Sequence, residues 1–94
     1  MRYRVFATKS YKKDYKRLWK SGYDLIKLEV AVDLLASFGV LPERYQDHAL
    51  HGVFSGSREC HIGPDWLLRY KKDGERLILV LISTGTHRDV LGIE

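Results

Sequence analysis

The spacing of apolar residues changes along this chain, and each period predicts a different element. Apolar and polar residues alternate over residues 2–7, which is typical of a strand. Apolar residues then recur at helical spacing over residues 11–19, with lysines and arginines between them. Ser10 is placed to cap this helix at its start and Gly22 to end it. The pattern predicts a short, basic, amphipathic helix in which Trp19 belongs to the buried stripe.

A second helix follows, because Asp24 is a favourable N-cap and Gly39 a favourable C-terminal stop. Between them apolar residues return every three or four positions, so one face of the helix is apolar. Two helices joined by a short turn are expected to pack as a hairpin. The expected buried stripe of the second helix comprises Leu25, Leu28, Ala31, Val32, Leu34, Leu35 and Phe38.

The second half of the chain has the two-residue period of strands. Turn signals divide it at residues 55–57, at Gly63-Pro64 and at Asp73-Gly74, the last a strong hairpin signal. The order of strand, helix, helix and four strands predicts an α+β fold, with both helices on one face of a mostly antiparallel sheet. Residues 77–83 are apolar on both faces, so this strand is expected at the centre. The four expected strands are residues 49–54, 58–62, 66–71 and 76–83.

Composition narrows the class of protein. Ninety-four residues, 45% apolar and 30% charged, fit one domain over residues 1–94. No apolar run approaches the roughly 18 residues that span a bilayer, and the N-terminus lacks a signal peptide's apolar block, so a cytoplasmic protein is expected. A single cysteine, Cys60, excludes an internal disulfide. The net charge of +4, with basic residues concentrated in residues 9–20, favours a polyanion or an acidic protein as partner.

Strand reversal brings four polar residues to one edge of the predicted sheet. In an antiparallel meander the second strand starts, the third ends, the fourth starts and the fifth ends at the same edge. These four places are held by His48, His61, Asp65 and His87. Alternation puts Cys60 and His61 on opposite faces, so His61 faces the open side if Cys60 joins the core. The sequence therefore predicts a histidine-rich site at this edge.

Grouped histidines suit the cleavage of RNA without a metal ion or cofactor. Their side chains exchange protons around neutral pH. RNA carries its own nucleophile, because a deprotonated 2′-hydroxyl attacks the adjacent phosphate while an acid protonates the leaving 5′-oxygen. Such a site needs cations around the phosphate and a plane on which a base stacks. The expected RNA-binding residues are Arg58, Arg69, Lys71 and Arg88, with Trp66 as the stacking plane.

Three motifs within residues 45–91 resemble those of one family. YQDHAL, RECHIGPDWLLRY and STGTHRDVL, in this order, are similar to motifs of the YafQ branch of the RelE-like bacterial mRNA interferase toxins. The resemblance implies a RelE-like fold and a ribosome-dependent endoribonuclease that cuts translated mRNA and inhibits growth. It also implies a cognate antitoxin of the DinJ or RelB type, in a two-to-two complex.

By the family's motifs, four residues match positions implicated in catalysis: His48, His61, Asp65 and His87. His87 matches the general acid, and Trp66 matches a tryptophan of the same site. The resemblance leaves open how acid and base roles divide among the others. Two positions depart from the family pattern: Leu91 replaces a frequent aromatic residue, and Ala49 a frequent proline.

Plainer explanations stay open for several residues. Asp65 follows Gly63-Pro64, where aspartate is a normal turn former. Trp66 would by default be a core aromatic residue. His51 has no partner in the predicted cluster and is interpreted as a surface or phosphate-contacting residue. Two other functions also stay open: a non-catalytic module that binds RNA or an acidic protein and, more distantly, a metal-dependent hydrolase.

Overall fold

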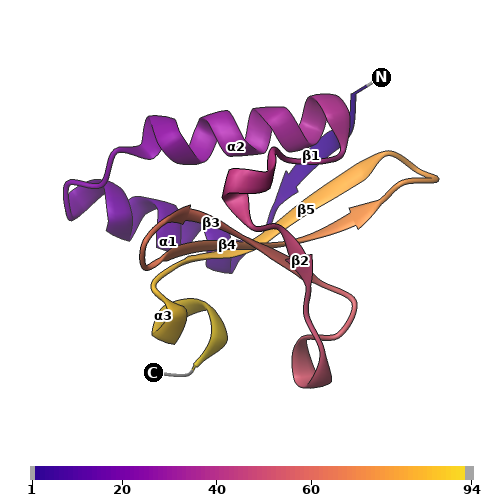
Figure 1. Ribbon diagram of the computed structural model, residues 1–94. Coiled ribbons are helices and arrows are strands. Elements are labelled where there is room, and N and C mark those ends of the chain that lie inside the picture. The colour runs from indigo at the N-terminus through magenta and orange to yellow at the C-terminus, as the bar shows by residue number, and fades with distance from the viewer. Residues whose placement is uncertain (1, 93–94) are drawn as a thin grey trace.

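Residues 2–92 are described by a computed structural model (Figure 1). Residues 1, 93 and 94, part of the expected single domain, lie outside the described residues. Two short 3-10 helices, η1 (Glu43–Tyr45) and η2 (Gly52–Phe54), interrupt the middle of the chain. The other elements are β1 (Arg4–Ala7), α1 (Lys9–Lys20), α2 (Leu25–Phe38), β2 (His48–Ala49), β3 (Arg58–Gly63), β4 (Trp66–Asp73), β5 (Ile78–Gly85) and α3 (His87–Leu91).

The five strands form one sheet in the order β1-β5-β4-β3-β2. β2 to β5 pair as an antiparallel meander, and β1 pairs in parallel with β5, with Arg4 opposite Ile78. The predicted α+β fold with a mostly antiparallel sheet is therefore confirmed. The apolar strand β5 is internal, as expected from its two apolar faces, although β4 is the middle strand of the five.

Side chains and backbone conformation at their ends define the two long helices. Thr8, rather than Ser10, caps α1, because its hydroxyl oxygen accepts a hydrogen bond from the Tyr11 N–H at 3.0 Å. Asp24 caps α2 by accepting a backbone N–H two residues on, and Gly39 ends it in left-handed backbone with φ +74°, both as predicted. Across residues 2–92, no helix has both the length and the apolar character needed to traverse a bilayer.

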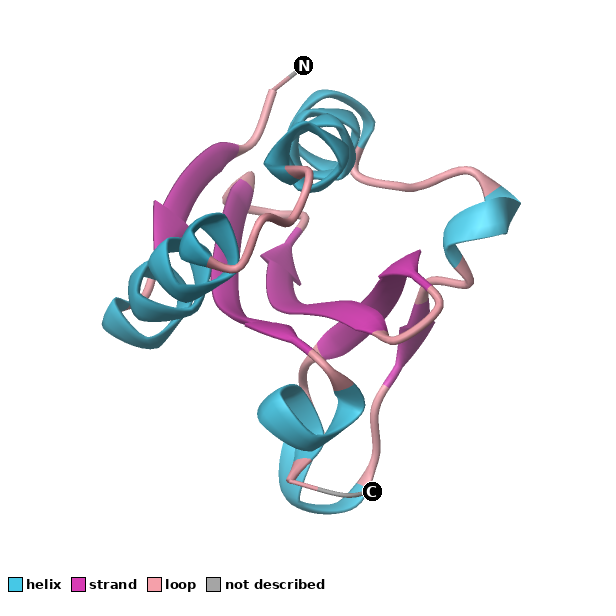
Figure 2. Cartoon of the chain, turned by 90° about the vertical axis from the view of Figure 1, so that its left-hand side faces the viewer, coloured by secondary structure: helices cyan, strands magenta, loops and turns pink. Residues whose placement is uncertain are grey.

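The hydrophobic core lies between the sheet and the two long helices (Figure 2). Trp19 and Phe38 are 67% and 72% exposed, so the expectation that they belong to the buried stripes is wrong. Trp19 is rotated by about 100° around the helix from the buried Leu18. The covered face of α2 ends with Leu35 and Ala36. The core comprises Tyr11, Leu18, Leu25, Leu28, Ala31, Leu35, Ala36, Tyr45, Cys60, Trp66, Leu68, Tyr70, Leu79 and Leu81.

The second strand is much shorter than the predicted segment 49–54. Only His48 and Ala49 pair with β3. The chain then turns at Gly52, whose φ of +66° is left-handed, and enters η2, where Val53 is 93% exposed. The apolar residues of this segment therefore belong to a connection that leaves the sheet.

α3 is a helix that the hydrophobic pattern does not predict, because its five residues are too few to show a period. A capping box builds it: the Thr86 hydroxyl accepts the Asp89 N–H at 3.1 Å, and Asp89 Oδ2 accepts the Thr86 N–H at 3.1 Å. α3 packs against β4 and β5, and its Val90 is buried. Leu67, which alternates with core residues of β4, is fully buried away from the main core cluster.

A one-residue irregularity in β5 changes which side chains face each side of the sheet. Arg69 pairs with Ser83 while Tyr70 pairs with Leu81, so Ile82 has no partner on β4. An extra residue of this kind shifts the two-residue alternation by one position. As a result Leu81 faces the core beside Tyr70, whereas Ser83 shares the opposite face with Arg69.

Candidate active site

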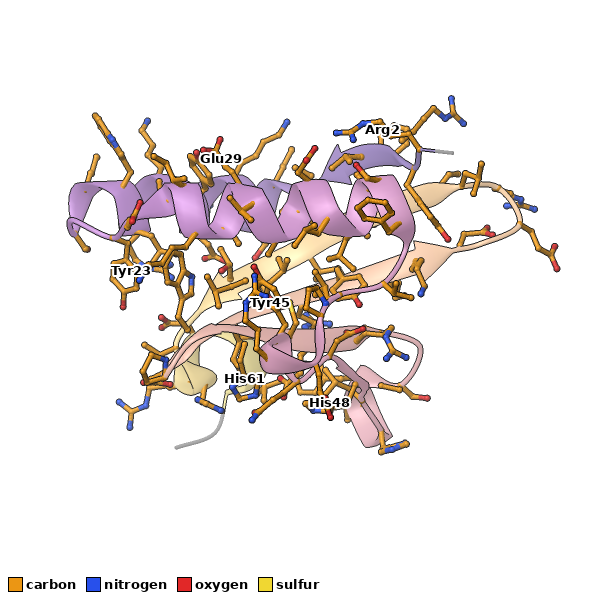
Figure 3. The ribbon with its side chains drawn as sticks, turned by 45° about the horizontal axis from the view of Figure 1, so that its top comes forward. Arg2, Tyr23, Glu29, Tyr45, His48 and His61 are labelled. Carbon is orange, nitrogen blue, oxygen red and sulfur yellow. The ribbon has the colours of Figure 1, made fainter. Side chains whose placement is uncertain are left out.

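Three imidazoles from separate elements meet at one edge of the sheet, as the strand reversals predict. The ring centroids of His48 and His61 are 6.4 Å apart, and those of His61 and His87 are 5.8 Å apart. His48 begins β2, His61 lies in β3 and His87 begins α3. Figure 3 shows His48 and His61 below Tyr45. Within residues 2–92, His51 makes no ring contact with this cluster.

His87 is held by Asp65 through two contacts with one carboxylate oxygen. The backbone N–H of His87 donates to Asp65 Oδ1 at 2.9 Å, and the ring Nδ1 lies 2.6 Å from the same oxygen. A carboxylate only accepts, so Nδ1 carries the proton and Nε2 is the nitrogen available to a substrate. The backbone bond first, then the ring bond, holds the pKa of Asp65 below its usual value. Asp65 therefore orients His87 as well as forming the turn.

The backbone conformation at Gly85, between β5 and α3, places His87 in this position. Gly85 has a φ of +147°, and a Cβ there would lie 2.9 Å from Asp89 Cβ, as well as 2.7 Å from Asp89 Oδ2. Contacts shorter than 3.0 Å exclude a side chain unless its neighbours shift. Because glycine fits here, β5 runs directly into the Thr86 cap of α3, and His87 becomes the first residue of the helix.

His48 contacts an oxygen atom at each of its ring nitrogens. Nδ1 lies 2.7 Å from the carbonyl oxygen of Gln46, and Nε2 lies 3.0 Å from Glu59 Oε1. Glu59 is the register partner of His48, and its side chain is only 7% exposed. Sequence reasoning missed Glu59 as a site residue, although alternation along β3 puts it on the same face as His61. Cys60 between them is buried as expected, and burial raises the pKa of its thiol.

Glu59 belongs to a row of polar side chains across the sheet. Glu59 pairs with Arg69 of β4, and Arg69 with Ser83 of β5. Glu59 Oε2, Arg69 Nε and Ser83 Oγ are buried atoms without a hydrogen-bond partner among residues 2–92. Burial lowers the pKa of Arg69, whose guanidinium carbon lies 4.6 Å from the centre of the Phe54 ring. Arg69, expected to contact RNA, is therefore half-buried against the β2–β3 connection.

Arg58 is engaged by protein groups. Its Nε and Nη2 each donate to an oxygen of Asp47 at 3.3 Å, and the Tyr70 hydroxyl donates to Asp47 Oδ1 at 2.5 Å. Asp47 immediately precedes His48, so these bonds tie the start of β2 to β3 and β4. Alternation puts Arg58 on the helix-covered face with Cys60. The structure thus gives Arg58 a structural contact where RNA binding was expected.

Trp66 is a core residue in this structure. It is 7% exposed, its ring packs edge-on against Tyr23 with centroids 4.9 Å apart, and its Nε1 donates to Thr84 Oγ1 at 3.0 Å. It does not offer the expected stacking plane, because alternation along β4 turns it toward the helices. The two other expected RNA-binding residues, Lys71 and Arg88, are exposed.

Two hollows adjoin His61, one of about 340 Å³ and one of about 430 Å³, and Arg44, His61 and Ile62 line both. Lys27 of α2 lines the first, so two cations that sequence reasoning assigned no role stand beside the cluster. Within residues 2–92, no group of three or more His, Cys, Asp or Glu side chains is arranged to hold a metal ion. The other lining residues are Ile26, Val30 and Tyr45 in the first hollow, and Gln46, Gly63 and Pro64 in the second.

Known proteins are similar to this chain in sequence and fold. The family described as the bacterial toxin of type II toxin-antitoxin system, YafQ, matches residues 3–92. The mRNA interferase toxin YafQ of Escherichia coli strain K12 is 39% identical over 83 residues, which are 87% of this chain and 88% of that protein. The crystal structure of the E. coli DinJ-YafQ toxin-antitoxin complex matches with TM-score 0.87 and 34% identity, covering 98% of this chain and 100% of the other. The metal-bound toxin from Helicobacter pylori matches with TM-score 0.84 and 37% identity, covering 96% and 99%.

The α+β fold and these matches define a bacterial toxin of a type II toxin-antitoxin system. Within that class, the chain belongs to the YafQ toxin family. The family resemblance of the three sequence motifs is therefore confirmed, and the match extends into the helical half of the chain.

Proposed function

We propose that this chain is an endoribonuclease, an mRNA interferase that cleaves mRNA on the translating ribosome without a metal ion. Two E. coli relatives are named mRNA interferase toxin YafQ. The observation that carries the proposal is the pair of His61 and His87, whose ring centroids are 5.8 Å apart. An acid and a base at this separation can act on two oxygens of one phosphodiester, each within hydrogen-bond reach.

His61 acts as the base and His87 as the acid. Neither ring nitrogen of His61 has a hydrogen-bond partner within residues 2–92, whereas both nitrogens of His48 contact oxygen atoms. His61 takes the proton of the 2′-hydroxyl, and O2′ attacks phosphorus while the bond from phosphorus to O5′ breaks. His87 Nε2 donates a proton to the departing O5′. The products are a 2′,3′-cyclic phosphate and a free 5′-hydroxyl. Asp65 keeps Nδ1 of His87 protonated and supports its imidazolium form.

Cations beside the cluster and farther along β4 support binding of single-stranded RNA. Arg88 follows His87 on α3, and Lys71 lies four residues along β4 from Leu67, the register partner of His61. Arg44 lines the hollows beside His61. The phosphates of the strand lie toward Lys71 and Arg88, and a nucleotide that flanks the cleaved bond lies at the hollows. The logarithm of the affinity for ribosomes or RNA should fall by about 0.7 per phosphate contact for each tenfold rise in salt concentration.

The partner that silences this toxin is a DinJ-like antitoxin. Two solved E. coli structures are DinJ-YafQ complexes. The net charge of +4 suits an acidic partner, because complementary charge speeds encounter and selects against wrong partners. Co-expression of the cognate antitoxin should restore growth to cells that produce the chain, whereas an unrelated acidic protein should not.

The direct test is to add the purified chain to ribosomes translating a defined mRNA and to map new mRNA ends. The parent should cut, and His87→Ala should cut at least about a hundredfold more slowly, because it lacks the acid. His51→Ala is the matched control, since it removes an exposed imidazole outside the cluster. The same mRNA without ribosomes should stay intact.

Two outcomes would overturn the proposal. If His87→Ala cuts as fast as the parent, the catalytic assignment is wrong. If the parent stalls translation without producing new ends, the chain is a non-catalytic binding module.

A further inference from the structure

The contacts of His48 require more protons than a neutral imidazole carries. Its Nδ1 is 2.7 Å from the Gln46 carbonyl oxygen, which can only accept a hydrogen bond. Nδ1 therefore carries a proton. Its Nε2 is 3.0 Å from Glu59 Oε1, and an ionised carboxylate also only accepts. Unless a second proton lies between Nε2 and Oε1, two lone pairs face each other.

The surroundings of Glu59 and His48 favour placing that proton on the imidazole. The Glu59 side chain is 7% exposed, and its Oε2 has no hydrogen-bond partner within residues 2–92. A buried carboxylate is costly unless positive charge lies nearby. Arg69 is the register partner of Glu59 on β4 but makes no ion pair with it within residues 2–92, so a cationic His48, at 3.0 Å, supplies that charge. The His48 side chain is 49% exposed, so water solvates its positive charge.

We propose that Glu59 holds His48 as a doubly protonated imidazolium, which makes His48 a fixed cation of the active site rather than its base. This inference rests on the proposed function for its catalytic consequence. The His48 ring centroid is 6.4 Å from that of His61, so its charge lies beside the phosphodiester on which His61 and His87 act. A preplaced cation stabilises the negative charge that develops on the phosphate oxygens in the transition state. Glu59 acts through His48 and is a positioning residue.

The protonation of His48 can be read directly from the ring nitrogens. We would label the histidines with ¹⁵N and record their shifts at pH 7.5 in the parent chain, assigning His48 with a His48→Gln sample. Both His48 nitrogens should give the shift of a protonated nitrogen. The shift of an unprotonated nitrogen in the His48 ring of the parent chain would overturn the proposal, whatever the activity of the chain. This measurement does not depend on any Glu59 variant being folded.

The catalytic consequence is tested with Glu59→Gln, which keeps the shape of the side chain and removes its charge. The amide can donate to Nε2, so His48 should become neutral and show one bare nitrogen while the contact survives. The kcat for mRNA cleavage should fall at least about tenfold, with a smaller change in KM for ribosomes. Glu75→Gln, at the exposed β4–β5 turn, is the matched carboxylate-to-amide control and should cut as the parent does.

The outcomes separate this inference from the proposed function. If Glu59→Gln is folded, loses the second His48 proton and keeps the parent kcat, the cation has no catalytic role and that part of the proposal is overturned. If the parent cleaves no mRNA, the proposed function fails, while the nitrogen shifts still decide how Glu59 and His48 share a proton.

Discussion

Removing one hydroxyl group, in Tyr70→Phe, should measurably destabilise the protein. Tyr70 is fully buried, and its hydroxyl donates to Asp47 Oδ1 at 2.5 Å. A hydrogen bond to a charged group contributes about 1.5–3 kcal/mol to stability. Asp47 keeps its two bonds from Arg58 in the variant, so it is not left unpaired. We therefore expect a loss of about 2 kcal/mol in the free energy of unfolding, which lowers Tm by roughly 8–16 °C in a domain of this size.

The assay is urea unfolding followed by tryptophan fluorescence, to which the buried Trp66 contributes a probe of the core. Tyr11→Phe is the matched control, because Tyr11 is also buried but its hydroxyl makes no hydrogen bond within residues 2–92. The control should stay within about 0.5 kcal/mol of the parent. If Tyr70→Phe does the same, the hydroxyl contributes nothing net and Arg58 alone anchors Asp47. Our account of how the start of β2 is held would then be refuted.

Three further predictions concern pH and the approach to α3. Burial raises the pKa of Tyr11 and Tyr70. The stability that they contribute should therefore be fully present below about pH 10 and should fall above it, where only the unfolded chain loses these protons. Urea midpoints that stay unchanged up to about pH 11 would contradict this. Hydrogen bonds from His87 lower the pKa of Asp65, so the stability that its carboxylate contributes is present above about pH 4 and is lost as pH falls further. Asp65→Asn should make stability less dependent on pH in this acidic range and should slow cleavage roughly a hundredfold. Gly85→Ala should displace α3 and reduce cleavage more than stability, measured by mRNA ends against the urea midpoint. Gly56→Ala introduces a side chain at a similarly positive φ, +91°, but meets no atom of residues 2–92 within 4 Å, so it should lower the urea midpoint and leave cleavage at the parent rate.

Features set by local chemistry could be predicted from the sequence. Asp24 and Gly39 bound α2 because each satisfies helix-end backbone groups whatever the rest of the fold does. The cluster of His48, His61 and His87 was also predictable, because antiparallel reversals force those strand ends to one edge.

Features set by tertiary packing could not be predicted in the same way. The exposure of Trp19 depends on where the sheet lies beneath α1, which helical spacing does not state. Trp66 has an aromatic ring suited to RNA, but its strand register turns it into the core. Glu59 reads as an ordinary polar residue of a half-exposed strand until the pairing of β2 places His48 opposite it. The capping box of Thr86 and Asp89 was the one available signal for α3.

The parallel pairing of β1 with β5 fixes when this protein can become active during its own synthesis. β1 can pair with β5 only after Ile78, the register partner of Arg4, has been synthesised, and contacts so distant in sequence form slowly. His87 follows later still, at the start of α3. A nascent chain that has not yet released these segments has no assembled histidine cluster. The histidine cluster can therefore assemble only after almost the whole described chain has left the ribosome that makes it.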